Sequence, residues 1–271
     1  MIDKLKPQRR WFQFSLRTLL LVMTVFALWL GWRMQKIRNE TQATAELEKL
    51  GARIVYLQYG KLPLYDRWLW KWSGDGPIAS VALKGPQVTD SHLKHLEPLS
   101  ELQELVLYEA RVTDDGLVHL RGLINLESLW LFDIEITDAG LKHVKDLTGI
   151  RVLCLFNTGV TDGGLRHLKG LTRLQRLDLG RTKVTDTGLE HLKDLTALQH
   201  LNLDRTNVTN TGLGSLRELV KLTDLDLQRT QVTGAGIRRL RKKLPKCKIM
   251  HHSLEMKQNI PPPTVIDPSL I

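Results

Sequence analysis

The sequence predicts an α/β fold: a right-handed, horseshoe-shaped solenoid with parallel strands on its concave side and helices on its convex side, preceded by one transmembrane helix. Three observations lead to this prediction. From Ile78 the chain repeats with a period of 24 residues, leucine supplies 52 of the 271 residues, and one long apolar run lies near the N-terminus. A fixed period of this length is typical of solenoids, whose repeats bury their apolar faces against each other.

The pattern divides the chain into six expected segments. They are a basic N-terminal flank (1–10), a transmembrane anchor (11–34), a helix/strand N-terminal cap with a Trp-rich segment (35–77), seven 24-residue repeats (78–245), a final capping strand (246–250) and a disordered Pro-containing tail (251–271).

The apolar run spans residues 18–32 and basic side chains flank it on both sides. Fifteen helical residues span ~22 Å, so the helix needs the aromatic residues before the run to cross a hydrocarbon core of ~30 Å. A cleaved signal peptide is the alternative, but no small-x-small site closes the run, and Ala43-Thr44-Ala45 lies too far downstream. We therefore expect an uncleaved anchor, in contact with the bilayer through residues 11–34.

The distribution of positive charge bears on the orientation of this anchor. Five basic side chains precede the apolar run and four follow it within twenty residues. By the positive-inside rule this small difference places the N-terminus inside and the repeats on the extracytoplasmic side of a single-pass membrane protein.

The cap is expected to begin with a short amphipathic helix over 39–50 and a strand over 53–59. The Trp-rich segment that follows contains Trp68, Trp70 and Trp72. Because the first repeat of a solenoid needs its open core covered, this segment is expected to act as a lid. A tryptophan platform for a ligand is the alternative.

Each repeat has the form LxxLxLxxTxVTDxGLxxLxxL, and no insertion interrupts the seven units. They open at Ile78, Leu102, Leu126, Ile150, Leu174, Leu198 and Leu222. This pattern resembles the leucine-rich repeat proteins, specifically the subtype with a Thr-Asp-x-Gly-Leu helix start. Such repeats occur in bacterial membrane-anchored proteins and, as a variant, in eukaryotic F-box substrate receptors. The resemblance covers about residues 51–250.

The consensus of one unit has a physical explanation. Alternation places Leu105 and Leu107 on the inner face of a short strand. Thr113 stands where it could cap a helix, and Asp114 in the first turn complements the helix dipole. The leucines that follow return to the same core at helical spacing.

Departures from the consensus lie mostly in the terminal units. His92 replaces Gly in the first unit, while Asn210 and Gly234 replace Asp in the last two. The seventh unit ends in a basic stretch, 238–243, which is expected to keep the end of the solenoid soluble. A nucleic-acid or phospholipid patch is the alternative for this stretch.

No residue pattern predicts catalysis or a metal site. The chain has no nucleophile elbow, Walker loop, HExxH or dinucleotide fingerprint, so we expect no enzyme and no cofactor. Cys154 and Cys247 fall four repeats apart, about 19 Å, too far for a disulfide. Five histidines recur at the repeat period and are expected on the outer face, where one per helix cannot converge on an ion. These are His95, His119, His143, His167 and His191.

The concave face is the expected binding surface. Its first half presents an apolar and aromatic patch of Val106, Tyr108, Trp130, Phe132, Val152, Cys154 and Phe156. Its second half presents Arg176, Asp178, Asn202, Asp204, Asp224 and Asp226, edged by Arg181, Arg205 and Arg229. Exposed apolar residues on a strand mark interfaces, unless the Trp-rich segment covers them. The arginines are either neutralised by the aspartates or receive an acidic group from a partner.

These observations predict a membrane-anchored module that binds a protein on its concave face. The predicted partner-binding residues are Tyr108, Trp130, Phe132, Phe156, Asp178, Asp204, Asp226, Arg181, Arg205 and Arg229. One alternative is a substrate receptor resembling those of ubiquitin ligases, for which the N-terminal region leaves no room for an F-box. Another is an anion-binding module that uses the three arginines. Nucleic acid is not an expected partner, since residues 51–271 are only mildly basic.

Overall fold

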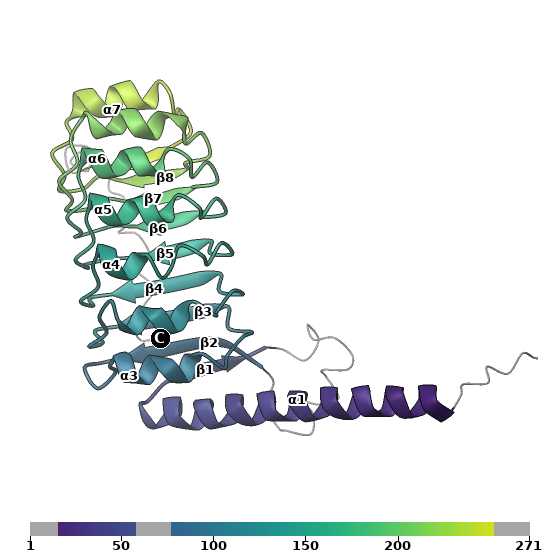
Figure 1. The fold of residues 1–271 in the computed structure, drawn as a ribbon. Helices are drawn as coiled ribbons and strands as arrows, with labels where there is room; N and C mark the ends of the chain where they lie inside the picture. The colour runs from purple at the N-terminus through teal and green to yellow at the C-terminus, as the bar shows by residue number, and fades with distance from the viewer. Residues whose placement is uncertain (1–15, 58–76, 252–271) are drawn as a thin grey trace, which may run out of the picture.

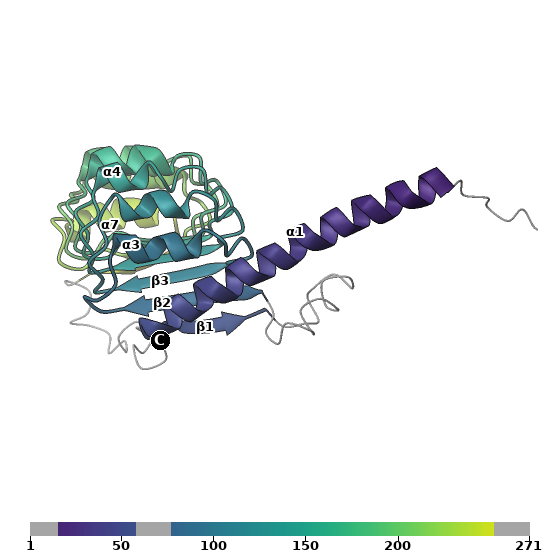
Figure 2. The same cartoon turned by 60° about the horizontal axis from the view of Figure 1, so that its bottom comes forward.

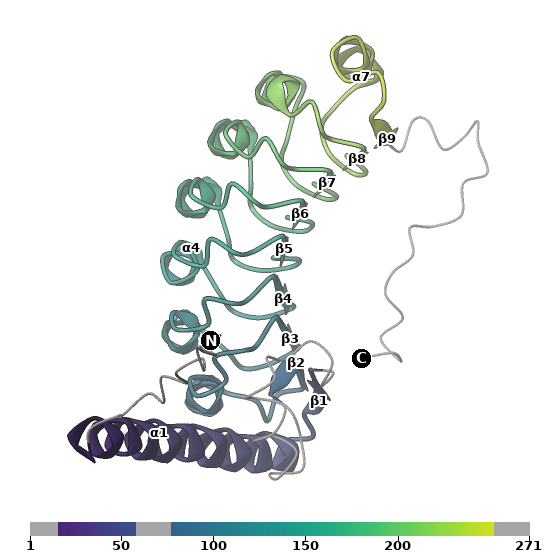
Figure 3. The same cartoon turned by 90° about the vertical axis from the view of Figure 1, so that its right-hand side faces the viewer.

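The computed structural model describes residues 16–57 and 77–251. The predicted basic flank, the three tryptophans of the cap and the tail from 252 lie outside these residues. Within them the chain forms one curved solenoid with strands on one side, helices on the other and a long helix across its N-terminal end (Figures 1 and 3). The predicted horseshoe with one preceding apolar helix is therefore confirmed.

The concave side is a sheet of nine strands that follow one another in chain order. The first strand pairs antiparallel with the second, and all later pairs are parallel. The strands are β1 (Arg53–Tyr56), β2 (Ile78–Lys84), β3 (Glu104–Tyr108), β4 (Ser128–Phe132), β5 (Val152–Cys154), β6 (Arg176–Asp178), β7 (His200–Asn202), β8 (Asp224–Asp226) and β9 (Lys248–Met250). Residues 24 apart face each other, as Leu105 does Leu129, so each repeat adds one strand.

The convex side carries short helical segments rather than long helices. They are α3 (Asp90–Leu93), η2 (Lys94–Leu96), η3 (Gly116–Leu120), α4 (Asp138–Leu141), α5 (Asp162–Leu165), η4 (Arg166–Leu168), α6 (Asp186–Leu189), η5 (Glu190–Leu192), η6 (Gly212–Glu218) and α7 (Gly234–Arg241). Those labelled η are 3₁₀ helices. Only the last α-helix of the solenoid reaches eight residues. The leucines of both sides form one continuous buried core that runs the length of the solenoid.

The first helix, α1, differs from the expected arrangement. It runs without a break over Leu16–Lys49, so the predicted anchor and the predicted cap helix are a single helix. Its C-terminal half contributes Ala43 and Leu47 to the core, where they cover the first repeat. The strand predicted over 53–59 is present as β1, which lies beside β2 and extends the sheet beyond the repeats.

Neighbouring repeats are joined by a polar contact that we call the inter-repeat clamp. The carboxylate of the Asp at each helix start accepts two hydrogen bonds from the next repeat, one from the Thr backbone N–H and one from its hydroxyl. In the central pair, Asp138 accepts from the Thr161 amide at 2.7 Å and from the Thr161 hydroxyl at 2.6 Å. The same contact recurs for Asp90, Asp114, Asp162 and Asp186. The consensus Asp therefore binds the next repeat in addition to starting a helix.

The clamp also explains the consensus glycine. A Cβ at Gly164 would stand 2.5 Å from Asp138 Oδ1 and 3.0 Å from a Leu141 methyl group. Real side chains do not approach a carboxylate oxygen so closely, so only glycine leaves room for the aspartate of the preceding repeat. The corresponding glycines are Gly116, Gly140, Gly188, Gly212 and Gly236.

The departures in the terminal units follow from the same contact. In the first repeat His92 stands at the glycine position, and no aspartate of the described residues needs that space; the His92 Nδ1 accepts a hydrogen bond from the Thr89 amide at 3.1 Å. Asn210 keeps the clamp, since its amide oxygen accepts from the Thr233 backbone N–H at 2.9 Å. Gly234 lies in the last repeat that the structure describes, so no threonine of a further described repeat needs an acceptor there.

One predicted cap is wrong. No helix starts at Asp114, because η3 begins at Gly116, and Thr113 donates its hydroxyl to Asp90 instead of capping. In the next repeats the capping role is present: the Thr137 and Thr161 hydroxyls each accept a backbone N–H at 3.3 Å. Clamp and cap thus use the same threonine, donating in one direction and accepting in the other.

Candidate functional site

The N-terminal half of the concave face carries a row of aromatic rings. Tyr108 and Phe132 are paired in register on β3 and β4, and their rings meet edge to face with centroids 6.2 Å apart. Phe132 also stacks on Trp130, with centroids 5.7 Å apart and the rings nearly parallel. All three side chains are half-buried. The sequence therefore placed these three residues together correctly.

Two residues of the predicted patch are not exposed, which corrects the prediction for them. Val106 is 7% exposed and Cys154 is 0% exposed. The register places both directly beside Trp130, one on each side, and the large indole group separates these two smaller side chains. The Trp130 Nε1 donor is itself buried, with no acceptor among the residues that the structure describes. The surface is thus narrower than predicted and consists of the aromatic rings and Val152.

Gly180 separates the aromatic half of the concave face from its charged half. A Cβ at this residue would lie 2.8 Å from Cδ2 of Phe156, so the phenylalanine ring occupies the space that a side chain would take. The Arg181 guanidinium lies over the same ring, 5.2 Å from its centroid. The predicted residues Phe156 and Arg181 are therefore in contact, an arrangement that favours a cation–π interaction.

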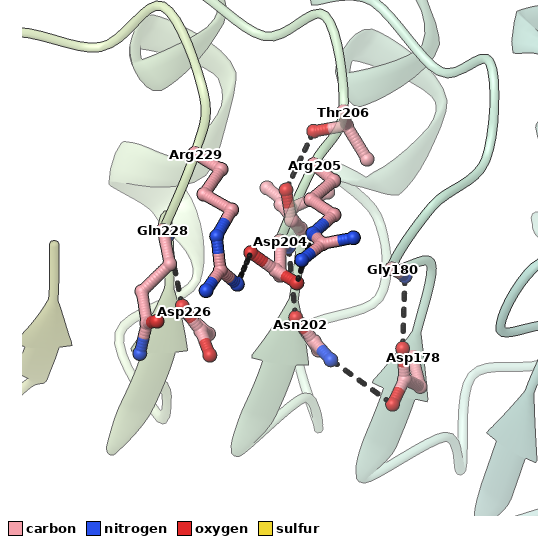
Figure 4. Close-up of polar contacts among 10 residues, drawn as sticks. Asp178, Gly180, Asn202, Asp204, Arg205, Thr206, Asp226, Gln228 and Arg229 are labelled. Carbon is pink, nitrogen blue, oxygen red and sulfur yellow. Dashed lines mark hydrogen bonds and ion pairs between the residues drawn. The ribbon is translucent and has the colours of Figure 1, made fainter. Parts of the chain in front are cut away.

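Three polar residues at equivalent positions of β6, β7 and β8 hold the turns that follow these strands (Figure 4). Asp178 accepts the Gly180 N–H at 2.8 Å, Asn202 accepts that of Asp204 at 2.8 Å, and Asp226 accepts that of Gln228 at 2.9 Å. Side chains of this type commonly bond a backbone amide two residues on. Asp178 and Asp226 therefore have a structural role in addition to any role in binding.

The arginine column occupies an unusual backbone position. Arg181, Arg205 and Arg229 have φ angles of 56°, 56° and 52°, in the left-handed region that glycine and asparagine adopt more easily. Asp204 faces two of them: its Oδ2 lies 3.7 Å from Arg205 Nε and its Oδ1 lies 3.4 Å from Arg229 (Figure 4). Neutralisation by an aspartate of the same chain, one of the two alternatives for the arginines, is thus seen for Arg205 and Arg229. It comes from the single carboxylate of Asp204 and not from a column of aspartates.

One residue on this face was not singled out from the sequence. His200 lies on β7 between Arg176 and Asp224 in register, and its Nδ1 is 3.0 Å from Asp224 Oδ2. The sequence could have indicated His200, because it lies two residues before Asn202 on the same strand and therefore points to the same face. Val152 continues the same column on β5 and is half-buried.

Burial raises the pKa of Asp178 above its ordinary value, against hydrogen bonds from Gly180 and Asn202 that lower it. The Asp178 carboxyl therefore holds its proton more tightly in the folded protein than in the unfolded chain. Its contribution to the stability of the folded state is lost as pH rises above 3.8 and through its raised pKa. We expect Asp178→Asn to gain thermal midpoint relative to the wild type as pH rises from 4 to 7, because its amide does not titrate, although it loses the acceptor for the Asn202 Nδ2–H at 3.1 Å. Asp146→Asn, at an exposed residue, is the control; equal gains in both variants would contradict the prediction.

The five histidines that recur at the repeat period differ in their burial and in their contacts. His119 Nδ1 lies 2.6 Å from Glu97 Oε1. His143 is buried, and burial lowers its pKa and that of His167. No group of three His, Cys, Asp or Glu that could hold a metal ion occurs within 16–57 and 77–251. Both cysteines are free and buried, which raises their pKa, in the case of Cys247 to about 11.

Comparisons with known proteins agree with this architecture. A model of the leucine rich repeat family matches residues 172–232. An internalin (inlF) from Listeria monocytogenes is 24% identical, with a TM-score of 0.55 over 64% of this chain and 47% of that chain. Internalin C2 from the same organism is 22% identical, with a TM-score of 0.51 over 64% of this chain and 80% of that chain.

The fold is a leucine-rich repeat solenoid. The chain spans about half the length of the inlF structure, and the likeness to both internalins is one of fold. A search of curated proteins finds no match. Repeat domains of this type are protein-interaction modules, and the concave sheet is the surface that such a solenoid offers to a partner.

The apolar helix adds a second element to the leucine-rich repeat solenoid. Among the described residues one helix, over Arg17–Lys49, is long and apolar enough to cross a membrane. By length and composition it fits a membrane span or a signal sequence equally. Its apolar side chains are exposed, as those of Leu21, Phe26 and Leu28 show.

Proposed function

We propose that this protein is a membrane-anchored interaction module that holds a partner protein on the concave face of its leucine-rich repeats. The observation that carries this proposal is the stacked row of half-exposed rings Tyr108, Phe132 and Trp130 on a preformed sheet. Aromatic anchors on a rigid surface are the usual hot spots of protein interfaces, because little conformational entropy is lost when they are covered.

The charged half of the face would set the register of the partner. Asp204, Arg205 and Arg229 form a small ion cluster at the rim of the sheet. Such exposed pairs contribute little to stability but guide association through complementary charge. Because Asp204 already faces two of the arginines, an anion-binding site is the weaker alternative, and the receptor alternative gains no support from the structure.

A photo-crosslinking experiment tests the binding face. Benzoylphenylalanine in place of Phe132 is expected to yield a crosslinked partner band in irradiated membranes, since that side chain lies in the centre of the row. The same group in place of Val118, an exposed residue away from the strands, is the control. Crosslinks that are equal at both positions, or confined to Val118, would reject the concave face as the site.

The anchor belongs to the same proposal. The helix that carries the apolar run also supplies Ala43 and Leu47 to the core, so its C-terminal half is part of the repeat domain. Cleavage at Ala43-Thr44-Ala45 would remove one of these core residues, which supports an uncleaved span. We place the repeats on the extracytoplasmic side, from the small excess of basic residues before the apolar run.

Two measurements on a C-terminally tagged chain test the anchor and its sidedness. The tag is expected to stay with membranes after alkaline washing and to be lost when protease is added to intact cells stripped of any outer layer. Release by alkali would refute the anchor. Protection of the tag until lysis would reverse the orientation and move the search for partners to the cytosol.

A further inference from the structure

We propose that one edge of the solenoid lies flat on the anionic headgroups of the membrane that holds the anchor; this inference rests on the anchor of the proposed function. The edge consists of the loops that lead from each helix to the next strand, here called the basic edge. Its loops are 97–103, 121–127, 145–151, 169–175, 193–199, 217–223 and 241–247. Because β2–β9 are parallel, all these loops lie on one side of the sheet.

The basic edge carries most of the net charge of the chain. Its seven loops contain twelve Lys or Arg against six Asp or Glu, an excess of six, where the whole chain has +10. The loops at the other ends of the strands form the opposite edge (85–91, 109–115, 133–139, 157–163, 181–187, 205–211 and 229–235). They contain five basic and nine acidic side chains. The two edges of one solenoid thus have opposite charge.

Part of this charge is a regular column. In the second to seventh repeats one exposed basic residue stands near the end of the helical segment, at the repeat period; the first repeat has Glu97 at this position. The basic residues are Arg121, Lys145, Lys169, Lys193, Arg217 and Arg241. Within the part of the chain that the structure describes, Lys169 alone among these six lies within ion-pair distance of an acidic side chain, Asp194 at 3.5 Å, and both side chains are largely exposed. Cations that are spaced evenly and face water are complementary to a layer of phosphate headgroups.

The path of α1 brings a bilayer to this edge. Near its C-terminal end, the Leu50 carbonyl accepts from Gln87, which lies in a loop of the opposite side. Fourteen residues earlier, Lys36 Nζ lies 3.3 Å from Glu101 in the first loop of the basic side. The helix therefore crosses beneath the first repeat and leaves the solenoid at the basic edge (Figures 1 and 2).

Only a few residues of α1 separate its apolar run from the basic edge. The apolar run ends at Trp32, four residues before Lys36, so the hydrocarbon begins ~6 Å beyond the point where α1 leaves the edge. The helix is continuous over Leu16–Lys49, with no flexible joint. It lies crosswise to the direction in which the repeats stack (Figures 1 and 3). A bilayer around the apolar run therefore runs alongside all the repeats, and not only the first.

Two exposed apolar side chains stand on the same edge. Ile124 is 70% exposed and Val220 is 74% exposed, and both lie in basic loops, four repeats apart. The equivalent positions in the three repeats between them are Thr148, Thr172 and Thr196. Apolar side chains among cations suit the interfacial region of a membrane, where the cations meet phosphates and the apolar groups enter the acyl boundary.

The test uses the full chain reconstituted in vesicles of phosphatidylcholine with phosphatidylglycerol. A fluorophore is attached at Ile124→Cys or at Glu135→Cys; these residues lie at the two ends of β4, on opposite edges. Both native cysteines are buried and leave the introduced thiol as the reactive one. We expect the label at 124 to be quenched by a headgroup-labelled lipid and shielded from acrylamide, and the label at 135 to behave in the reverse way.

Removing positive charges from the basic edge tests whether the cations bind the headgroups or merely lie near them. Lys169→Gln, Lys193→Gln and Arg217→Gln together are expected to weaken contact about fivefold per cation, roughly a hundredfold in the docking equilibrium. The control removes two exposed cations from the opposite edge that lie outside the proposed binding face (Arg111→Gln and Lys183→Gln) and should leave lipid contact at 124 unchanged. High salt should act like the triple variant.

The outcomes distinguish this inference from the anchor itself. A chain that alkali extracts from the vesicles would refute the anchor. A chain that stays in the bilayer with equal acrylamide quenching at 124 and 135 would refute the docked edge and leave the anchor intact. Contact at 124 that is unchanged in pure phosphatidylcholine, or in the triple variant, would overturn the role assigned to the cations.

Discussion

Replacing Gly164 with alanine is expected to destabilise the protein by about 2–3 kcal/mol, a cost typical of overpacking in a closely fitted interior. The added methyl group would stand 2.5 Å from Asp138 Oδ1, and the carboxylate cannot move away without breaking its two bonds to Thr161. Chemical denaturation followed by circular dichroism gives the free energy of unfolding.

A double-mutant cycle identifies the cause of this loss. Asp138→Ala alone should cost about 2 kcal/mol, because it leaves the Thr161 amide and hydroxyl without their acceptor. In that background Gly164→Ala should add almost nothing, since the oxygen that it would meet is gone. Gly214→Ala, where a Cβ meets nothing within 4 Å, is the matched control and should be neutral or stabilising. Additive losses in the cycle would show that the clamp is not the reason for the glycine.

Replacing Phe132 with alanine is expected to weaken partner binding by about 2 kcal/mol, roughly thirtyfold, the loss typical of an interface hot spot. Phe132 contacts the rings on both sides of it, Tyr108 and Trp130, so its removal opens the centre of the row. The measurement is the dissociation constant for the partner captured by crosslinking.

Two comparisons keep this result interpretable. The thermal midpoint of Phe132→Ala should fall only slightly, because the side chain lies outside the leucine core. Val118→Ala should leave affinity unchanged. Wild-type affinity in Phe132→Ala would exclude the aromatic row as an anchor, whereas lost affinity with a large fall in midpoint would indicate misfolding.

The fold could be predicted almost completely, because every repeat has the same sequence pattern. A strand signal, a turn and a helix start recur every 24 residues, so one ambiguous unit is corrected by its neighbours. The register of β3, β4 and β5 follows directly from that period. The joining of anchor and cap into one helix was missed because the polar residues from Arg33 onward suggested an interruption, whereas the backbone continues to Lys49.

The contacts between neighbouring repeats were harder to predict from the sequence. The pattern shows that Asp and Gly recur, but not that the aspartate of one unit occupies the space that a side chain of the next would need. The concave site was predicted in outline, with its rings and arginines at the right positions. Burial of Cys154 and the shared carboxylate of Asp204 could not be predicted, because both depend on the sizes and rotamers of side chains on adjacent strands.

The inter-repeat clamp gives the solenoid a head and a tail, like a polymer with distinct end groups. His92 and Gly234 close the two ends, and every internal joint is chemically interchangeable. Removing 24 residues, for instance 139–162, would join Asp138 to Gly163 and let it bond Thr185, opposite Gly188. Unequal recombination within the gene can therefore lengthen or shorten the protein by whole units without inventing a new joint. Each such event would resize the concave surface by one strand, ~4.8 Å.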